Sequence, residues 1–392
     1  MSGTVARPAH VAVVVPTMGP AGAERVARAL AEEFVKGARV TVVTFDPRLS
    51  RRALARTGAP PWAGQIPAGC DHVHLPATSS GPRRLVVLAA RFARLARRRR
   101  FDVVYSFLTY TNIVVAAARV AGVHRFVHVA SEHAMAESLR GGPRGARLLA
   151  RTLPVVYRVP DHLVVVSDAA RRSLTAAGVV PRPARAVTVH NPINLAAVRG
   201  LASRPVANAD LDRLRRRGPV LACFARLHAQ KDHPTLLRAL RLLPSTYSLL
   251  LVGDGPQRTE LARIARELGV ADRTTFVGAV DNPYPIMSRV DVVVLASVEE
   301  GFGLVALEAA ALGVPFVGSD VGGLSEVCSA LGHPTFPVGD AVALAAVITG
   351  LAGRRGPPVA ADRLSPFDVA HVASRYLALA RPVPHRPVRV TA

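Results

Sequence analysis

The sequence predicts an α/β protein made of two Rossmann-like domains whose parallel sheets face each other across a cleft. The chain has 392 residues and is 50% hydrophobic, which is enough for two ordinary cores. In each half, short apolar runs alternate with helical stretches rich in Ala, Leu and Arg, as in the βαβ units of a parallel sheet. Residues 194–218 lose this pattern and carry the charged run L-D-R-L-R-R-R-G. We therefore expect a linker there.

Each half supplies several candidates for buried strands. In the first half they are residues 10–15, 39–45, 102–107, 125–131 and 162–167, and in the second half 219–225, 247–253, 274–278, 291–296 and 315–319. Helical stretches such as 256–268 separate them. We expect an N-terminal domain at 1–205, a C-terminal domain at 206–364, and a helix and tail at 365–392 that pack back on the N-terminal domain. Ligands bind at the carboxyl ends of the strands in such sheets, so the site should lie where the domains face each other.

The charge of the chain favours anionic ligands. The net charge is +23, and Lys36 and Lys231 are the only lysines among 50 basic residues, so the charge is almost entirely arginine. Such a balance suits anionic substrates or anionic lipid surfaces. With 5% aromatic residues and no stacking platform, nucleic acid is not expected as a partner.

Two further observations concern the compartment. The three cysteines are scattered without CxxC spacing, so neither a disulfide framework nor a zinc site is indicated. The first apolar run, residues 11–15, is too short for the core of a signal peptide or for a membrane span. We expect a cytoplasmic protein.

The strongest candidate site is the segment 297–313, S-V-E-E-G-F-G-L-V-A-L-E-A-A-A-L-G. A strand runs into a glycine-rich turn, and Gly301 and Gly303 let the backbone approach a ligand closely. The helix that begins near Leu304 directs free N–H groups and its positive end at the same place, which suits a phosphate. Glu308 lies about 6 Å further along the helix axis, where it can accept bonds from hydroxyls. With Glu300, these groups predict a pocket for a sugar nucleotide rather than the two opposed carboxylates of a glycosidase.

Arg226 and Lys231 form a second candidate site. They lie in the loop A-R-L-H-A-Q-K-D that follows the strand at 219–225. Both can reach one diphosphate and stabilise the negative charge that grows on a leaving nucleotide diphosphate. Arginine is common in this chain, so the rare Lys231 is the more informative of the two.

Two features of the N-terminal half are also candidates. Gly22 belongs to the turn P-T-M-G-P-A-G-A-E-R-V, which follows the first strand and opens a helix, and a plain turn is as good an interpretation as a ligand-facing loop. His133, in V-A-S-E-H-A-M, follows a strand and can donate to a sugar hydroxyl or to a transition-state charge. A surface histidine with no such role is an equally good interpretation.

The stretch 83–100 is basic and amphipathic. Its apolar residues recur at helical spacing, and arginines surround them. A helix that covers the sheet with a solvated arginine face is the first interpretation, and a surface for anionic lipid is the second.

Taken in order, these motifs resemble the retaining glycosyltransferases of family 4, which have the GT-B fold. The resemblance rests on S-V-E-E-G-F-G-L-V-A-L-E-A, with Glu300 and Glu308 separated by seven residues, on G-V-P-F-V and G-G-L-S-E-V, and on R-L-x-x-x-K. It extends over most of the chain through V-S-D-A-A-R-R-S-L, H-N-P-I-N and V-G-D-G-P. In two places the chain carries one more methyl group than the family pattern: Ala225 precedes the arginine where Gly is usual, and Ala21 replaces the first Gly of a Gly-Gly pair.

The resemblance implies transfer of a sugar from a nucleotide diphosphate sugar to an acceptor, with retention at the anomeric carbon. It implies an N-terminal domain that binds the acceptor and a C-terminal domain that binds the donor. Arg226 and Lys231 are then expected on the donor diphosphate, Glu308 on the ribose hydroxyls and Glu300 on the donor sugar. His133 is expected to face the transferred sugar, and Gly22 to lie near the diphosphate. In the donor site, the turn is expected to contribute Gly301, Phe302, Gly303 and Leu304.

We expect no metal or other cofactor, because Arg226 and Lys231 supply the positive charge. The expected partners are a nucleotide-sugar donor, with a weak preference for uridine, and a glycan, lipid-linked or small-molecule acceptor, with peripheral contact to an anionic membrane as a further expectation. Two alternatives are a sugar-nucleotide epimerase or phosphorylase of the same fold and a non-catalytic basic protein that binds lipid or nucleic acid. A pyridoxal-phosphate phosphorylase is disfavoured because Lys231 is the only lysine available in the C-terminal domain.

Overall fold

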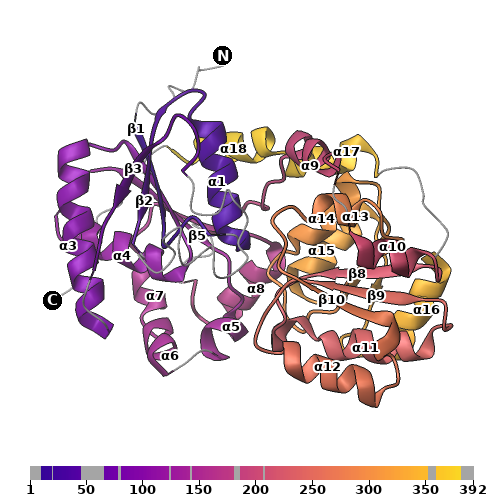
Figure 1. Ribbon diagram of the computed structural model, residues 1–392. Helices are drawn as coiled ribbons and strands as arrows, with labels where there is room; N and C mark the ends of the chain where they lie inside the picture. The colour runs from indigo at the N-terminus through magenta and orange to yellow at the C-terminus, as the bar shows by residue number, and fades with distance from the viewer. Residues whose placement is uncertain are drawn as a thin grey trace.

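The computed structural model describes residues 10–19, 21–45, 66–77, 81–122, 125–141, 144–180, 186–205, 208–351 and 359–380. It contains two α/β domains side by side, each built on one parallel sheet (Figure 1). Two stretches about which the sequence made expectations, the first nine residues and the Pro-rich end at 381–392, lie outside the described residues.

The N-terminal sheet has seven strands in the order β3-β2-β1-β4-β5-β6-β7. The strands are β1 (His10–Val15), β2 (Arg39–Thr44), β3 (Asp71–His74), β4 (Val103–Phe107), β5 (Val127–Glu132), β6 (His162–Val165) and β7 (Ala186–Thr188). Helices α1 (Gly22–Phe34) and α18 (Val369–Ala378) contribute to the core on one face, and α3 (Gly81–Arg99) and α4 (Thr109–Val120) to the core on the other. Helices α5 (Ala136–Gly141), α6 (Arg144–Ala150), α7 (Leu153–Val156) and α8 (Asp168–Ala176) complete the domain.

The C-terminal sheet has six strands in the order β10-β9-β8-β11-β12-β13. They are β8 (Val220–Phe224), β9 (Ser248–Val252), β10 (Thr274–Gly278), β11 (Val292–Leu295), β12 (Phe316–Ser319) and β13 (Thr335–Phe336). The surrounding helices are α9 (Leu195–Ala202), α10 (Ala209–Arg215), α11 (His233–Leu242), α12 (Arg258–Glu267), α13 (Tyr284–Met287), α14 (Leu304–Ala311), α15 (Gly322–Leu331), α16 (Ala341–Leu351) and α17 (Ala361–Leu364).

The central strands are buried on both faces, which explains why their sequences are continuous apolar runs. The two-sheet α/β fold and all ten predicted strands are confirmed, with ends that differ by one or two residues. The structure adds β3, β7 and β13, which lie at sheet edges. Edge strands are short and half exposed, and β3 alternates half-buried and exposed residues in D-H-V-H, so they lack the apolar run that marks a central strand.

The chain crosses between the domains twice, at neighbouring places. Helix α9 packs against α13 and α14, so the first crossing comes before Leu195. The second crossing leads from α17, which packs on α14 and α15, to α18, which packs on α1 (Figure 1). The crossings are joined by backbone hydrogen bonds, from Ile193 N to Phe367 O (2.8 Å) and from Val369 N to Ile193 O (3.1 Å).

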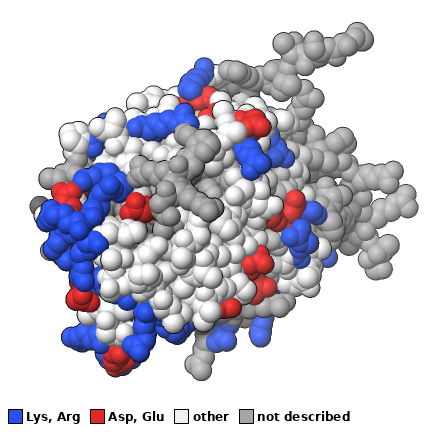
Figure 2. Space-filling model, turned by 90° about the vertical axis from the view of Figure 1, so that its right-hand side faces the viewer, with Lys and Arg blue, Asp and Glu red and all other residues white. Residues whose placement is uncertain are grey.

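The surface charge is unevenly distributed. On the face of the C-terminal domain in Figure 2, basic side chains gather mainly toward the left and the edges, with acidic side chains among them, and the middle is largely uncharged. Among the described residues, no helix combines the length and the apolar character needed to cross a bilayer.

Candidate functional site

The order of strands in the C-terminal sheet places the two candidate loops next to each other. Strands β8 and β11 are neighbours although β9 and β10 come between them in sequence, so this is the point where the strand order reverses. The basic loop follows β8 and the glycine-rich turn follows β11. Two hydrogen bonds join them: Val298 N donates to Gln230 O (2.9 Å), and Gln230 Nε2 donates to Glu299 O (3.2 Å).

Lys231 and Glu300 form an ion pair across this junction. Their side chains are 20% and 17% exposed, so both are partly shielded from water. Ser297 Oγ also donates to Glu300 Oε2 at 3.3 Å. Glu300 therefore holds the lysine in place, and the pair lies between the basic loop after β8 and the turn that leads into α14.

Neighbouring atoms leave no room for a side chain at the two glycines of the turn, which the sequence did not show. A Cβ atom on Gly301 would lie 2.8 Å from the carbonyl oxygen of His133 in the other domain. Gly303 is the residue before α14 and has a φ of +92°, and a Cβ there would lie 2.6 Å from Leu324 Cδ1. In the structure each of these glycines also admits a neighbouring part of the protein, and the close approach of a ligand to their backbone stays a prediction.

Phe302 and Leu304 have different surroundings. The Phe302 side chain is buried between His190 and Phe367, at ring-centroid distances of 5.6 and 6.1 Å, beside the crossings between the domains. Only its backbone can serve a ligand. Leu304 is the first residue of α14, and a Cβ on Gly22 would lie 3.6 Å from Leu304 Cδ1. The N-termini of α1 and α14 therefore meet, one from each domain.

The V-G-D-G-P motif supports the loop that carries Arg226. Leu227 N donates to Asp254 O at 3.0 Å. The glycines of the motif leave no room for a side chain. A Cβ on Gly253 would lie 2.0 Å from Ala225 O, and a Cβ on Gly255 would lie 2.3 Å from Leu227 O. Arg226 itself is exposed, and it forms no ion pair with the described acidic residues. It is thus a free cation on a rigid loop.

His133 lies on the N-terminal side of the junction. Its Nε2 is 3.1 Å from Ser131 Oγ, which is 3.0 Å from the hydroxyl of Tyr376 on α18. The backbone N–H of His133 donates to the buried Glu132 carboxylate at 2.8 Å. Burial lowers the pKa of His133 to about 4, so the imidazole is neutral near pH 7. A neutral ring can both donate and accept a hydrogen bond.

Glu308 has a partner that the sequence did not suggest. Its buried carboxylate forms an ion pair with Arg25 of α1, in the other domain. Tyr284 OH lies 2.8 Å from Arg25 Nη2 and 3.3 Å from Glu308 Oε1. The carboxylate expected to bind ribose hydroxyls is thus held by a guanidinium group.

The structure brings most of the candidate residues to one junction between the domains. The Lys231–Glu300 pair, the turn at 301–304, Gly22 and the His133 backbone are linked by the contacts above, and Arg226 extends from the same loop as Lys231. Sequence reasoning missed Arg25, Tyr284, Ser167 and Glu326, which act across the domain boundary. Arg25 lies in the turn motif that we singled out, so its position was a weak signal.

Comparison with known proteins identifies the family. Residues 20–197 match Glycosyltransferase Family 4, and residues 218–353 match Glycosyl transferases group 1, so that the two matches include most of both domains. The chain is a family 4-like glycosyltransferase with the GT-B fold.

Individual relatives match this glycosyltransferase over shorter stretches. The chain is 46% identical over 79 residues to N-acetyl-alpha-D-glucosaminyl L-malate synthase of Bacillus anthracis, and the aligned stretch is 20% of the chain and 21% of that protein. The chain is 31% identical over 211 residues to 2-deoxystreptamine glucosyltransferase of Streptomyces kanamyceticus, and the aligned stretch is 47% of the chain and 52% of that protein. The chain thus spans from about a fifth to about a half of the length of these relatives.

The fold is also that of a solved structure, Anabaena Alr3699/HepE in complex with UDP and glucose. The TM-score is 0.75 at 21% identity, and the match covers 94% of this glycosyltransferase and 98% of that chain. The predicted resemblance and the GT-B fold are both confirmed.

Proposed function

We propose that this protein transfers a sugar from a nucleoside diphosphate sugar, with UDP as the nucleotide, to a hydroxyl group of an acceptor, with net retention at the anomeric carbon. Family membership supports sugar transfer, and the family resemblance implies retention. The relatives named above include a glucosyltransferase, and the Anabaena protein was crystallised with UDP and glucose.

The observation that carries this proposal is the Lys231–Glu300 pair at the N-terminus of α14. A diphosphate at this position meets the Lys231 ammonium group, the guanidinium group of Arg226 and the free N–H groups of the helix start, formed by the backbone of Gly301, Phe302, Gly303 and Leu304. Glu300, held by Ser297 and Lys231, then lies beside the donor sugar and accepts bonds from its hydroxyls.

The reaction breaks the bond between the anomeric carbon and the diphosphate oxygen. Negative charge grows on the diphosphate as it leaves, and cations fixed in advance stabilise it without reorganisation. We therefore assign Lys231 and Arg226 to the leaving group. Their charges allow the reaction to proceed without a metal ion. Glu308 is assigned to the ribose hydroxyls, in place of its present partner Arg25.

The N-terminal domain is assigned to the acceptor. The backbone carbonyl of His133 adjoins the glycine-rich turn and its imidazole is neutral, so we assign the ring to a hydrogen bond with the transferred sugar and Gly22, at the start of α1, to the neighbourhood of the diphosphate. The acceptor is a glycan, a lipid-linked molecule or a small metabolite. Its contacts are expected in loops near residues 134–151, of which 142–143 lie outside the described residues.

Helix α3 supports a peripheral contact with anionic membrane as part of this function. Its buried face packs on the sheet through Leu88, Ala89, Phe92, Ala93 and Ala96, so it is a sheet-covering helix. Its outer face exposes Arg94, Arg97 and Arg98, together with Val86 at 68% exposure. Clustered basic side chains on the exposed face of a helix are suited to an anionic lipid surface. Binding to vesicles with 30% phosphatidylglycerol, compared with pure phosphatidylcholine, tests this contact.

A thermal-shift screen of uridine, guanosine and adenosine diphosphate sugars tests the central proposal, since one positive result identifies base and sugar together. We expect a UDP-sugar to raise the Tm. Transfer from that donor to candidate acceptors then follows, with the anomeric configuration of the product read by NMR. If no nucleotide sugar raises the Tm while anionic vesicles bind tightly, the non-catalytic alternative replaces the enzyme. An inverted product would contradict retention alone.

A further inference from the structure

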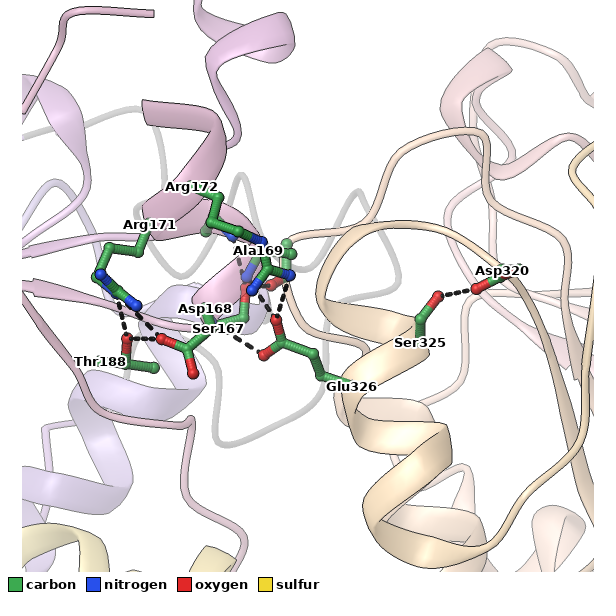
Figure 3. A network of polar contacts seen from close by, with 11 residues as sticks. Ser167, Asp168, Ala169, Arg171, Arg172, Thr188, Asp320, Ser325 and Glu326 are labelled. Carbon is green, nitrogen blue, oxygen red and sulfur yellow. Dashed lines mark hydrogen bonds and ion pairs between the residues drawn. The ribbon is translucent and has the colours of Figure 1, made fainter. Parts of the chain in front are cut away.

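The two domains are joined by a second set of polar contacts between α8 and α15 (Figure 3). Glu326 of α15 points across the boundary, and its carboxylate accepts hydrogen bonds from the backbone N–H groups of Asp168 (2.9 Å) and Ala169. Arg172 of α8 adds an ion pair at 3.4 Å. A carboxylate from one domain thus occupies the N-terminus of a helix in the other, where the free N–H groups and the helix dipole favour a negative charge.

Ser167 makes a second link next to this one. It is fully buried and is the N-cap of α8, where its Oγ accepts a hydrogen bond from Ala170 N at 3.0 Å. The same hydroxyl donates to the carbonyl oxygen of Gly301 at 2.9 Å. The start of α8 is therefore bonded directly to the glycine-rich turn.

Helix α15 supports that turn from the other side. Gly323 N donates to Glu300 O at 2.9 Å. A Cβ on Gly322 would lie 2.4 Å from Glu300 O, and a Cβ on Gly323 would lie 2.0 Å from Gly301 O. The turn is thus enclosed between the glycine pair of α15 and the N-cap of α8. Glu326 lies one helical turn beyond these glycines and joins α15 to the start of α8.

We propose that Glu326 and Ser167 are positioning residues that hold the N-terminal domain in register with the glycine-rich turn, so that His133 lies beside the donor sugar. The proposal rests on the function proposed above. Glu300 and His133 belong to different domains, and the Glu326 and Ser167 contacts fix the distance between those domains at the reacting centre. Charge-assisted hydrogen bonds are the stronger kind, and an error of about 1 Å in positioning can lower a rate by about 10²-fold.

Neither residue is assigned a contact with the nucleotide, and this separates positioning from binding. In Glu326→Ala, the C-terminal domain keeps Arg226, Lys231 and Glu308, so we expect the Kd for UDP, measured by calorimetry, to stay within about twofold of wild type. We expect kcat for transfer to fall about tenfold or more, because both domains must be in register. Small-angle scattering should show a larger radius of gyration in the absence of UDP.

Two further variants make the test specific. Glu326→Gln keeps an oxygen that can accept one N–H but loses the charge, so its kcat should lie between wild type and Glu326→Ala. Ser325→Ala is the matched control, because Ser325 is on the same helix but bonds to Asp320 in its own domain. It should leave kcat and Kd unchanged.

Several outcomes would overturn the proposal. An unchanged kcat in Glu326→Ala, or equal losses of kcat in Glu326→Ala and Ser325→Ala, would show that the contact does not position the domains. A loss of UDP affinity that matches the loss of kcat would assign Glu326 to binding. If Glu326→Ala does not fold, Glu326→Gln and Ser167→Ala decide by the same measurements. Failure of the proposed function is distinct, because the wild-type protein would then transfer no sugar.

Discussion

Arg25 in the N-terminal domain and Glu308 in the C-terminal domain are 283 residues apart in sequence and form an ion pair at the point where α1 and α14 meet. The Glu308 side chain is 4% exposed and that of Arg25 is 30% exposed. Arg25 and Tyr284 both contact Glu308 Oε1, so a ribose hydroxyl that binds this oxygen competes with Arg25. The same pair links the domains when no donor is bound.

Arg25→Ala should increase the affinity for UDP, because Glu308 no longer has a partner to lose. The pair is partly solvated, so its net worth is about 1 kcal/mol, which corresponds to an affinity gain of about fivefold. The Tm should fall, since a buried carboxylate is left unpaired. Calorimetric titration with UDP and thermal unfolding measure the two effects.

Arg28→Ala serves as the control for this substitution. Arg28 lies one turn further along α1 and pairs with Glu32 in the same helix at 3.0 Å. It should leave the UDP affinity unchanged. A weaker affinity in Arg25→Ala would show that the guanidinium group itself contacts the donor.

Lys231→Ala should lower kcat by about 10²-fold to 10³-fold, the usual loss when one preorganised group that stabilises transition-state charge is removed. The rate should be the same with excess EDTA and with Mg²⁺, for wild type and variant alike. Lys36→Ala is the control, since Lys36 is the other lysine of the chain and pairs with Glu33 on the surface of the N-terminal domain. Undiminished transfer by Lys231→Ala would end its assigned role, and activity restored by Mg²⁺ would replace the lysine by a metal ion as the source of charge.

Gly303→Ala should destabilise the protein by about 1–3 kcal/mol, because an L-residue is strained at a φ of +92° and the new Cβ overlaps Leu324. Gly200→Ala is the control, and we expect it to change the free energy of unfolding in the opposite direction. Gly200 lies inside α9, and a Cβ there meets no atom within 4 Å, so this change should stabilise by about 0.5–1 kcal/mol. Urea denaturation measures both. Equal effects of the two substitutions would contradict the conformational argument.

Acid should destabilise the protein well above the pH at which its carboxylates titrate. Burial lowers the pKa of His133, His233 and His333 to about 4 and that of His128 to about 3. Unfolded histidine titrates near 6.5. Between pH 6.5 and 4 the unfolded state therefore binds more protons, so the free energy of unfolding falls as the pH falls through this window. Each histidine contributes up to about 1.4 kcal/mol per pH unit.

His233→Leu tests the origin of that dependence. His233 is fully buried, and neither ring nitrogen has a hydrogen-bond partner in the described part of the chain, so the substitution removes a titrating group with little other change. Between pH 6.5 and 4, the slope of the unfolding free energy against pH should decrease by the amount that corresponds to about one proton fewer taken up on unfolding. A slope equal to that of wild type would show that His233 is not involved.

The sequence predicted the two sheets and the position of the donor loops because these follow from local patterns. Buried parallel strands are apolar throughout, and the loops that follow β8 and β11 carry charged residues and glycines at the carboxyl ends of neighbouring strands. The proximity of Lys231, Glu300 and the turn at 301–304 could be expected in this way, and their roles stay predictions. Their meeting at neighbouring strands follows from the strand order, which a regular βαβ pattern makes predictable.

The relationships between the domains could not be predicted in the same way. Arg25 is one of many arginines, and only the folded chain places it on Glu308. Glu326 and Ser167 have no local pattern that indicates a partner on the other domain. The contact of Gly301 with the other domain was also not predicted, since the neighbour that excludes a side chain is the carbonyl oxygen of His133. Such contacts depend on how two separate cores are oriented, and no periodicity along the chain encodes that orientation.

The paired crossings at Ile193 and at Phe367–Val369 restrict how the two halves of the molecule can move. The two crossing segments are hydrogen-bonded to each other, so we expect the two domains to rotate about a single axis that passes through these segments. The Arg25–Glu308 pair and the Glu326 contacts join other elements of the two domains, α1 to α14 and α8 to α15, so a rotation about this axis must strain or break them. Separation of the two domains is therefore opposed at two further places.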